Sequence, residues 1–333
     1  MKISILTAVY NAAPFLPQCL DSVMAQTFAD WQMVCVDDAS ADASLSIIER
    51  YAAADSRIQV VHLDKNQGAA HARNEAFRLT DGDVVMMLDA DDWLAPDALA
   101  QIAAEFERDE RTDCVLFDLQ MYYSDNDVRP FCTLPELPVS GYEALRMSIG
   151  WHSLHGVYAV RRRLHELHPY DESSHTFSDD NTTRFHYLDS RQVAFSHAAY
   201  FYRQRTDSSS HKIGISRFMV LEALFALRTD LIADGRIKQP EIDTLDTYIW
   251  HNIQGAYMIY YACRRTFSAA DRRRAATLLR TCHRRCCTKH LPLLEHLRFG
   301  YAPIKWCPAV YRLQMRVFTH LRLLLGLDRH RYD

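Results

Sequence analysis

The first part of the chain alternates short apolar runs with segments whose apolar residues recur at helical spacing. Helical spacing is seen from Pro14 to Met24, from about Ser40 or Asp42 to Tyr51, from Gly68 to Leu79 and from Pro96 to Glu107. Between them lie five runs typical of buried strands: 3–9, 31–36, 58–63, 84–88 and 113–119. This alternation predicts an α/β fold with a mostly parallel sheet and helices on both faces, where ligands bind at the carboxyl ends of the strands.

The pattern changes further along the chain. From about 125 to 212 short strands mix with loops, and from about 215 onward the spacing is helical. The expected helices are 216–234, 239–266, 268–290 and 308–327. We therefore predict an α/β domain over residues 1–212 and a helical region over residues 213–333.

Charge divides the chain at nearly the same place. The total of −4 hides 17 basic and 32 acidic residues in 1–211, and 21 basic and 10 acidic residues in 212–333. Two parts of opposite charge suggest two tasks. The 48% of hydrophobic residues excludes a disordered chain, and only 10 Gly and 11 Pro exclude a collagen-like one.

Cysteine and hydropathy patterns bear on the compartment. Nine cysteines without Cys-x-x-Cys spacing argue against a disulfide framework. A metal site is conceivable in the crowded segment that holds Cys282, His283, Cys286, Cys287 and His290, although a reduced helix is the simpler expectation. Without a signal peptide or a long apolar run, we expect a cytoplasmic protein with at most peripheral membrane contact.

Glycine placement excludes two phosphate-binding devices. The first glycine is Gly68, so neither Gly-x-Gly-x-x-Gly nor a P-loop follows the first strand. A bound diphosphate would need another source of positive charge, most simply a metal ion.

Carboxylates gather where two predicted strands end. The fourth strand runs into Asp89, Asp91 and Asp92, and such a cluster favours a hard divalent cation. The alternative is an acidic turn that caps the next helix. Asp37 and Asp38 end the second strand, and Tyr10 with Asn11 ends the first; an aromatic ring beside a carboxylate suits a nucleobase.

Four segments together resemble glycosyltransferase family 2, whose inverting enzymes have the GT-A fold and use nucleotide-sugars. The segments are Thr7-Ala8-Val9-Tyr10-Asn11, Asp37-Asp38-Ala39-Ser40-Ala41-Asp42, Asn66-Gln67-Gly68-Ala69-Ala70-His71-Ala72-Arg73-Asn74 and Asp89-Ala90-Asp91. The resemblance covers residues 1 to about 120 and places donor binding there, with the acceptor and catalytic part over residues 121–212.

The resemblance also implies roles for residues around the donor. Tyr10 and Asp38 would contact the nucleobase, Arg73 the base and ribose, and Asp89 the ribose, with Thr7 and Ala90 beside them. Asp91 would coordinate Mg²⁺ or Mn²⁺ on the diphosphate, where the metal acts as a Lewis acid. A later Tyr-Phe-Tyr-Arg segment offers cations to the diphosphate from Arg203, Arg205 and His211.

The same family places a carboxylate base at the start of a late helix. The segment Phe177-Ser178-Asp179-Asp180 fits this position, and we expect Asp180 to take the proton from the acceptor hydroxyl. The alternative is that the pair only favours a helix N-terminus. Trp151, His155 and Asp179 fall where acceptor-binding residues are expected.

The helical region mixes basic residues with Trp, Tyr and Leu. This composition suits peripheral binding to an anionic membrane at the inner face of the cytoplasmic membrane, or equally a solvated basic face of a packed subdomain. Nucleic-acid binding is not expected, because no reader motif accompanies the charge.

Together these features predict a metal-dependent inverting glycosyltransferase, a hexosyl- or N-acetylhexosaminyltransferase. It would move a sugar from a nucleoside-diphosphate donor, most simply UDP-linked, to a glycan or lipid-linked glycan acceptor of lipopolysaccharide or capsule. The alternatives are a non-catalytic nucleotide- or glycan-binding module and a sugar nucleotidyltransferase.

Overall fold

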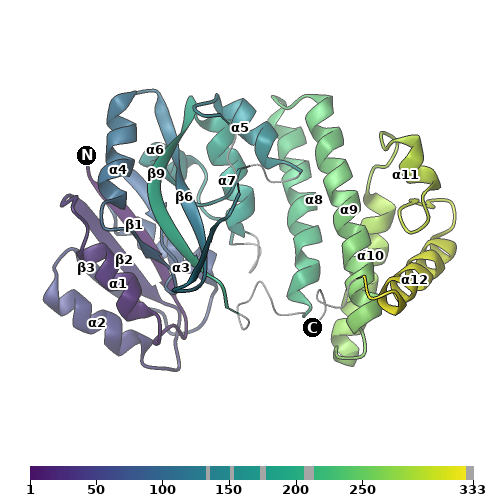
Figure 1. Ribbon diagram of the computed structural model, residues 1–333, viewed down its shortest axis with the longest axis horizontal. Helices are drawn as coiled ribbons and strands as arrows, with labels where there is room; N and C mark the ends of the chain where they lie inside the picture. Colours follow the sequence, from purple (N-terminus) through teal and green to yellow (C-terminus); the bar gives the residue numbers. More distant parts are fainter. Residues whose placement is uncertain (133–135, 151–153, 173–177, 206–213, 328–333) are drawn as a thin grey trace. The chain divides into compact units, whose positions relative to one another are not determined.

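A computed structural model describes residues 1–132, 136–150, 154–172, 178–205 and 214–327 (Figure 1). The chain forms two compact units, residues 1–148 with 152–205, and residues 149–151 with 206–333. The first unit holds the sheet and the second is helical.

The described part of the first unit contains a nine-stranded mixed sheet of order β3-β2-β1-β4-β8-β6-β9-β5, with β7 paired to β6. Its parallel half is built from β1 (Ile3–Val9), β2 (Trp31–Asp37), β3 (Ile58–His62) and β4 (Val84–Met87). Beyond β4 the parallel order breaks. β8 (Tyr158–Arg161) runs antiparallel to both neighbours, β4 and β6 (Thr112–Ser124).

The far edge of the sheet returns to the acidic segment. β9 (Gln192–Arg203) lies parallel to β6, and β5 (Trp93–Leu94) pairs antiparallel with β9. The hairpin strand β7 (Asp127–Pro130) extends β6. Because β5 follows Asp89–Asp92 directly, β9 anchors the end of the segment that β4 begins.

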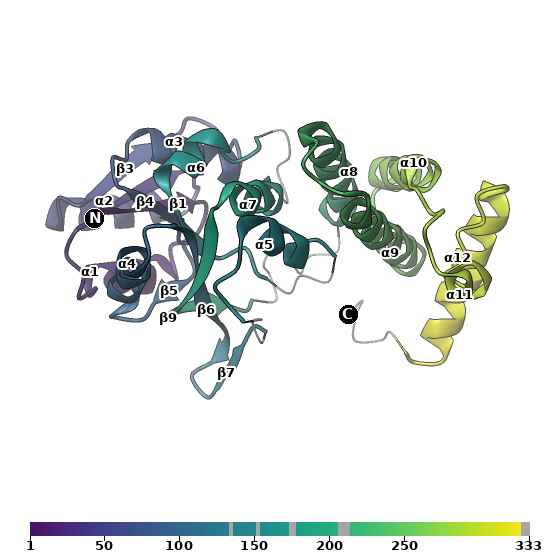
Figure 2. The same cartoon turned by 90° about the horizontal axis from the view of Figure 1, so that it is seen from above.

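Helices cover both faces of the sheet, as the alternating pattern predicts (Figure 2). On one face α1 (Leu16–Met24), α2 (Ser44–Ala54) and α4 (Ala98–Arg108) share one hydrophobic core with alternate residues of β1, such as Ile3 and Ile5. On the other, α3 (Ala69–Arg78) packs on Leu6 of β1 and on Val34 and Val36 of β2. The remaining helices of this unit are α5 (Gly141–Ser148), α6 (Arg162–Leu167) and α7 (Ser178–Asp189).

Two helix starts differ from the sequence prediction. α1 begins at Leu16, with Pro17 rather than Pro14 in its first turn. Neither Ser40 nor Asp42 caps α2, which begins at Ser44. Ser40 Oγ instead accepts from the Asn11 backbone N–H. The Asp42 carboxylate accepts from the backbone N–H groups of Ala13 and Ser44 (3.1 and 2.9 Å), so it joins the first strand-end turn to the start of α2.

The second unit contains α8 (Ser216–Asp234), α9 (Gln239–Cys263), α10 (Ala269–Arg285), α11 (Leu293–Leu297) and α12 (Pro308–Leu324). The predicted helix over 268–290 ends earlier, at Arg285, and α11 was not predicted. Trp250 and Tyr311 are fully buried in its core. None of the helices in the described ranges has the length and apolarity needed to cross a membrane.

Candidate active site

Two strand-end turns are tied together by their own side chains. The Asn11 backbone N–H donates to Ser40 Oγ (3.0 Å), and the Ala41 N–H donates to Asn11 Oδ1 (2.8 Å). Asn11 and Ala39 both adopt positive φ, +49° and +57°. These contacts fix Tyr10, whose ring is 54% exposed, at the edge of the sheet where a planar ligand can stack on it.

Asp38 holds the start of α3. Its two carboxylate oxygens accept from the backbone N–H groups of Gln67 (2.7 Å) and Gly68 (2.8 Å), and its side chain is buried. Gly68 has φ +93°, a conformation that favours glycine. Each oxygen keeps a second lone pair, so the carboxylate can still accept from a nucleobase N–H.

Two ion pairs flank the acidic turn after β4. Arg73 on α3 donates to Asp89 Oδ1 (2.5 Å), and Arg205 after β9 donates to Asp91 Oδ2 (3.1 Å). These four residues share one pocket with Tyr10, Asp38 and Ala90, and its complete lining is Ala8, Val9, Tyr10, Ala12, Asp38, Ala69, Arg73, Asp89, Ala90, Asp91 and Arg205. The structure thus brings together most of the residues that the motifs assign to the donor.

The chemistry of Asp91 suits a divalent cation. Burial raises the pKa of its carboxyl, and the negative charge of Asp89 raises it further, with Arg205 acting in the opposite direction. A cation held there would offset both the burial of the Asp91 charge and its repulsion by Asp89. Asp91 is therefore the residue of this pocket that would hold Mg²⁺ or Mn²⁺.

Asp92 has a different function from its neighbours. It is buried, accepts from Tyr200 Oη–H (2.8 Å) and from the Arg203 backbone N–H (2.8 Å), and thereby joins the turn to β9. Burial raises the pKa of Asp92 well above the ordinary value, and the charges of Asp89 and Asp91 add to this. Tyr200 also accepts from the Asp89 N–H (3.2 Å).

Tyr200 was not predicted as a site residue. Its only signal in the sequence is its position at the head of the Tyr-Phe-Tyr-Arg segment.

Two predicted donor residues make structural contacts. Thr7 is buried and its hydroxyl donates to the Leu88 carbonyl (2.8 Å), which fixes the end of β4. The Arg203 guanidinium donates to the Asp91 carbonyl (2.9 Å) and to Gln18 Oε1 (2.5 Å), and it lies over the Trp93 ring. Neither side chain lines the described pocket.

Asp180 lies in the first turn of α7. Its side chain is about half exposed, and Arg184, one turn later, pairs with Asp180 Oδ1 (3.2 Å). Arg184 itself is nearly fully buried and also donates to the Ser148 carbonyl (3.4 Å). The carboxylate is therefore held by a buried cation and is about half exposed.

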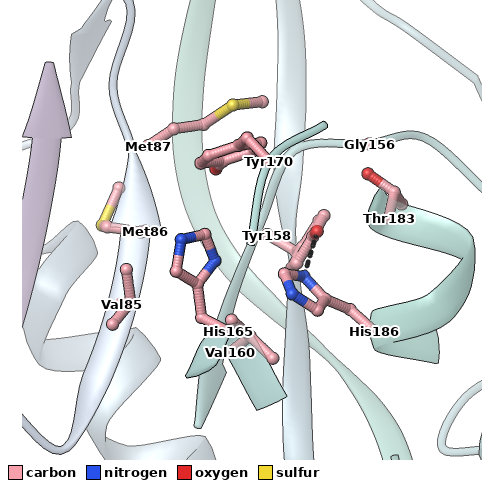
Figure 3. A pocket seen from close by; sticks show the side chains of 10 residues that line it. All are labelled: Val85, Met86, Met87, Gly156, Tyr158, Val160, His165, Tyr170, Thr183 and His186. Atoms are coloured by element: carbon pink, nitrogen blue, oxygen red, sulfur yellow. Dashed lines mark hydrogen bonds between the residues drawn. The ribbon is translucent and has the colours of Figure 1, made fainter. Parts of the chain in front are cut away.

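An enclosed pocket shows how α7 is seated on the sheet (Figure 3). His186 and Thr183 of α7 face Tyr158 of β8 and Met87 of β4 across it, and the Tyr158 hydroxyl bonds His186 Nδ1 (2.6 Å). Burial lowers the pKa of His186 well below its ordinary value and that of His165 to about 4. These histidines are neutral packing groups rather than catalytic acids or bases.

Of the three residues predicted to bind the acceptor, the structure describes the side chain of one, His155. His155 is buried, both ring nitrogens bond backbone groups of Phe117 and Val157, and burial lowers its pKa to about 4. It lines a separate pocket with Phe131 and Phe195. Trp151, His211 and the side chain of Asp179 lie outside the described residues.

Sequence reasoning missed a clamp behind Arg73. The Asn74 amide donates to the Tyr170 carbonyl (2.9 Å) and to Glu172 (2.7 Å), and His71 bonds the same Glu172 (2.7 Å). The clamp joins α3 to the segment that precedes α7. No local pattern could reveal it, because its partners lie about 100 residues apart.

The chain is similar in sequence to known glycosyltransferases. Residues 4–166 match the model of glycosyl transferase family 2. The poly(ribitol-phosphate) beta-glucosyltransferase of Bacillus spizizenii is 34% identical over 123 residues, which are 36% of this chain and 19% of that protein. Chondroitin synthase of Escherichia coli is 34% identical over 113 residues, 34% of this chain and 16% of that protein. The chain thus spans less than a fifth of the length of these two relatives.

Solved structures match over nearly the whole chain. S. aureus TarS 1-349 in complex with UDP-GlcNAc has a TM-score of 0.71 at 17% identity, covering 98% of this chain and 92% of that one. The mannosyltransferase PcManGT of Pyrobaculum calidifontis, in complex with GDP-Man and Mn²⁺, has a TM-score of 0.55 at 19% identity, covering 97% and 87%. The predicted fold is confirmed: residues 4–166 match glycosyl transferase family 2, within a GT-A fold that is followed by a helical region.

Proposed function

We propose that the chain is a metal-dependent inverting glycosyltransferase that uses a nucleoside-diphosphate sugar, UDP-linked in the simplest case. The observation that carries this proposal is the pocket in which Tyr10, Asp38, Arg73, Asp89 and Asp91 converge at the carboxyl ends of β1, β2 and β4. The UDP-GlcNAc and GDP-Man bound in the structures of similar fold support a nucleotide-sugar donor.

Each donor contact follows from the chemistry of the pocket. The exposed Tyr10 ring would stack on the base, and Asp38 would accept a base N–H with its remaining lone pairs. Asp89 would accept ribose hydroxyls, held in place by Arg73. A divalent cation held by Asp91 would neutralise the charge of the departing diphosphate.

Asp180 would act as the general base. The half-exposed carboxylate can reach an acceptor hydroxyl, and Arg184 keeps it oriented. The acceptor we propose is a hydroxyl of a glycan or lipid-linked glycan of a bacterial surface polysaccharide. The name of the similar Bacillus spizizenii protein, a poly(ribitol-phosphate) beta-glucosyltransferase, supports this class.

The Asp180→Asn variant tests the proposal. The amide cannot accept the proton, so transfer should fall by about 10²–10⁴-fold while UDP binding is kept. Asp97→Asn, an exposed carboxylate at the start of α4, serves as the control. Unchanged transfer in Asp180→Asn would refute the base assignment. If the wild type binds donor without turnover, a non-catalytic module is favoured. If it releases pyrophosphate, a nucleotidyltransferase is favoured.

We also propose that the C-terminal unit docks on an anionic membrane. Five apolar residues of α12 recur at helical spacing on its exposed face: Val310, Leu313, Val317, Leu321 and Leu324. The opposite face, with Tyr311 and Met315, is buried in the unit. Trp306 and Leu324 are 81% and 79% exposed. A contiguous group of exposed apolar side chains indicates an interaction site, whereas isolated ones do not.

The charge around this stripe selects the type of partner. Residues 291–327 contain five basic residues, Arg298, Lys305, Arg312, Arg316 and Arg322, against the single acid Glu295. An apolar stripe bordered by cations suits the interface of an anionic bilayer. It is poorly suited to a neutral solvated surface, since the apolar residues would stay in water.

Vesicle sedimentation tests the docking. Wild-type protein should sediment with vesicles rich in phosphatidylglycerol at low salt and much less with phosphatidylcholine vesicles. The double variant Leu313→Ser/Leu324→Ser should lose binding, whereas Ile232→Ser, which removes an exposed apolar residue of α8, should keep it. Equal binding by all three proteins would contradict the assigned surface.

A further inference from the structure

A second cluster of metal-ligating side chains lies within the helical unit, outside the candidate active site. Asp246 of α9, Cys287 and His290 each offer one ligand atom, and these atoms lie within 4.8 Å of one another. Asp246 is fully buried, and the other two are partly buried. The cluster uses two members of the Cys-His segment together with an aspartate some 40 residues earlier.

Hydrogen bonds around His290 fix which ring nitrogen carries the proton. The Thr247 hydroxyl donates to the Asp243 carbonyl (2.9 Å), so its oxygen is the acceptor toward His290 Nε2 (2.9 Å). Nε2 is therefore the protonated nitrogen of the neutral ring. Nδ1 keeps a bare lone pair, which is the form that ligates metals.

This lone pair is buried and has no hydrogen-bond partner among the described residues. The Asp243 carboxylate, itself an acceptor, lies 4.0 Å from this nitrogen. Two acceptors that face each other beside a thiol repel unless a proton or a metal ion lies between them. A buried lone pair in such surroundings is costly to leave unsatisfied.

From this arrangement we infer that Asp246, Cys287 and His290 form a Zn²⁺ site. Mixed sulfur, nitrogen and oxygen ligands are the set that Zn²⁺ prefers, whereas Mg²⁺ and Mn²⁺ prefer oxygen. Tetrahedral zinc with bonds of about 2.0–2.3 Å sets its ligands about 3.3–3.8 Å apart, so side-chain shifts of roughly 1 Å complete the site. Water would supply the fourth ligand.

The neighbours of Asp246 are those of a supported ligand. Arg228 donates to both of its oxygens (2.5 and 2.9 Å), and these bonds raise the pKa of Arg228. Ligating carboxylates are commonly hydrogen-bonded in this way by a second group, which fixes their orientation. Zinc would thus fasten the turn after α10 to α9, within one unit of the fold.

Zinc content and spectroscopy test the site. In an Asp91→Asn background, which removes the proposed donor metal, the protein should retain one equivalent of zinc after dialysis against metal-free buffer. Cobalt substitution should give the near-ultraviolet charge-transfer band of a cobalt–thiolate bond. Cys287→Ser should lose both the zinc and the charge-transfer band, and His290→Gln should lose the zinc. Cys307→Ser, which removes another free cysteine of this unit, should keep both.

Thr247→Val gives a graded readout. It leaves the three ligands in place but removes the acceptor that fixes the His290 tautomer, so zinc affinity should fall about 10–100-fold. Failure of the wild type to retain zinc would overturn the assignment, as would zinc retention by Cys287→Ser or His290→Gln. Because glycosyl transfer is not measured, the result is independent of the proposed function.

Discussion

Asp91 is a residue at which ligand binding and stability oppose each other. Its surroundings raise the pKa of its carboxyl, which means that the folded protein disfavours the ionised form relative to the unfolded chain. The cation expected at this residue reverses that preference. The free energy of unfolding should therefore depend on both the charge at this position and the metal.

The first prediction is that Asp91→Asn does not destabilise the metal-free protein. The neutral amide removes the unfavourable burial of charge. Metal-dependent UDP binding should be lost in the same variant. Thermal unfolding with and without Mn²⁺ and UDP measures both effects, and full UDP binding in chelator by the wild type would contradict the metal role.

A second prediction concerns pH. A folded-state pKa raised above the unfolded value means that the native state holds the proton more tightly. The contribution of such a group to the free energy of unfolding is therefore greatest below the ordinary carboxyl pKa and is lost as pH rises through the raised pKa. Asp91 and Asp92 both contribute in this direction. The double variant Asp91→Asn/Asp92→Asn should flatten this part of the stability profile, measured by urea unfolding between mildly acidic and neutral pH.

A third prediction separates support from ligand contact at Thr7. Thr7→Val keeps the shape but removes the hydroxyl that bonds the Leu88 carbonyl, so stability should fall by about 1–3 kcal/mol. UDP affinity should change little, because the side chain does not line the described pocket. Loss of UDP binding in a variant that melts normally would show instead that Thr7 touches the donor.

At the scale of elements, β9 holds the acidic turn from the far edge of the sheet. Tyr200 and the Arg203 backbone hold Asp92, and the pairing of β9 with β5 fixes the residues that follow. The turn is thus fastened at both ends, by β4 and by β9. Such support from fixed elements keeps a binding site preorganised.

The fourth prediction follows from this fastening. Tyr200→Phe removes the donor to Asp92 and the acceptor for the Asp89 N–H, and we expect a loss of about 1–3 kcal/mol in stability. Donor affinity should fall as well, although Tyr200 is buried and cannot touch the donor. Tyr123→Phe, at an exposed tyrosine of β6, is the control for calorimetric UDP titration.

Sequence patterns were most informative where structure is local. The strand–helix alternation predicted β1 to β4 and their helices, and the motifs predicted most of the residues that line the pocket. β8 lies in the stretch where short strands were expected without bounds. β5 was not predicted, because its two residues are a strand only through their pairing with β9, about 100 residues further on. The same reason hid Tyr200 and the Asn74 clamp, whose contacts span about 100 residues.

At the scale of the whole molecule, the two units differ in charge as well as in fold. The acidic excess of residues 1–211 includes the strand-end carboxylates, and the basic excess of residues 212–333 borders the apolar stripe of α12. Charges on a surface are screened within about 8 Å at physiological ionic strength, whereas buried pairs are screened much less. Salt should therefore affect membrane docking more than donor binding.

The fifth prediction uses this difference. Raising the salt concentration should reduce transfer to an acceptor embedded in anionic vesicles much more than transfer to a soluble acceptor. Parallel assays over one salt series measure the ratio of the two rates. Equal decline of both rates would indicate that salt acts on the active site and would contradict docking through the basic surface.

Arg205 lies at the boundary between the two units. It is the final residue of the first unit, and its guanidinium touches Asp91, so the backbone leaves that unit directly from the donor pocket. A change at Asp91 that moves Arg205 therefore acts on the last residue before the helical unit. Thermodynamic linkage makes coupling between two binding events reciprocal. If tethering the helical unit to a surface changes donor affinity, donor must change the tethering by the same factor.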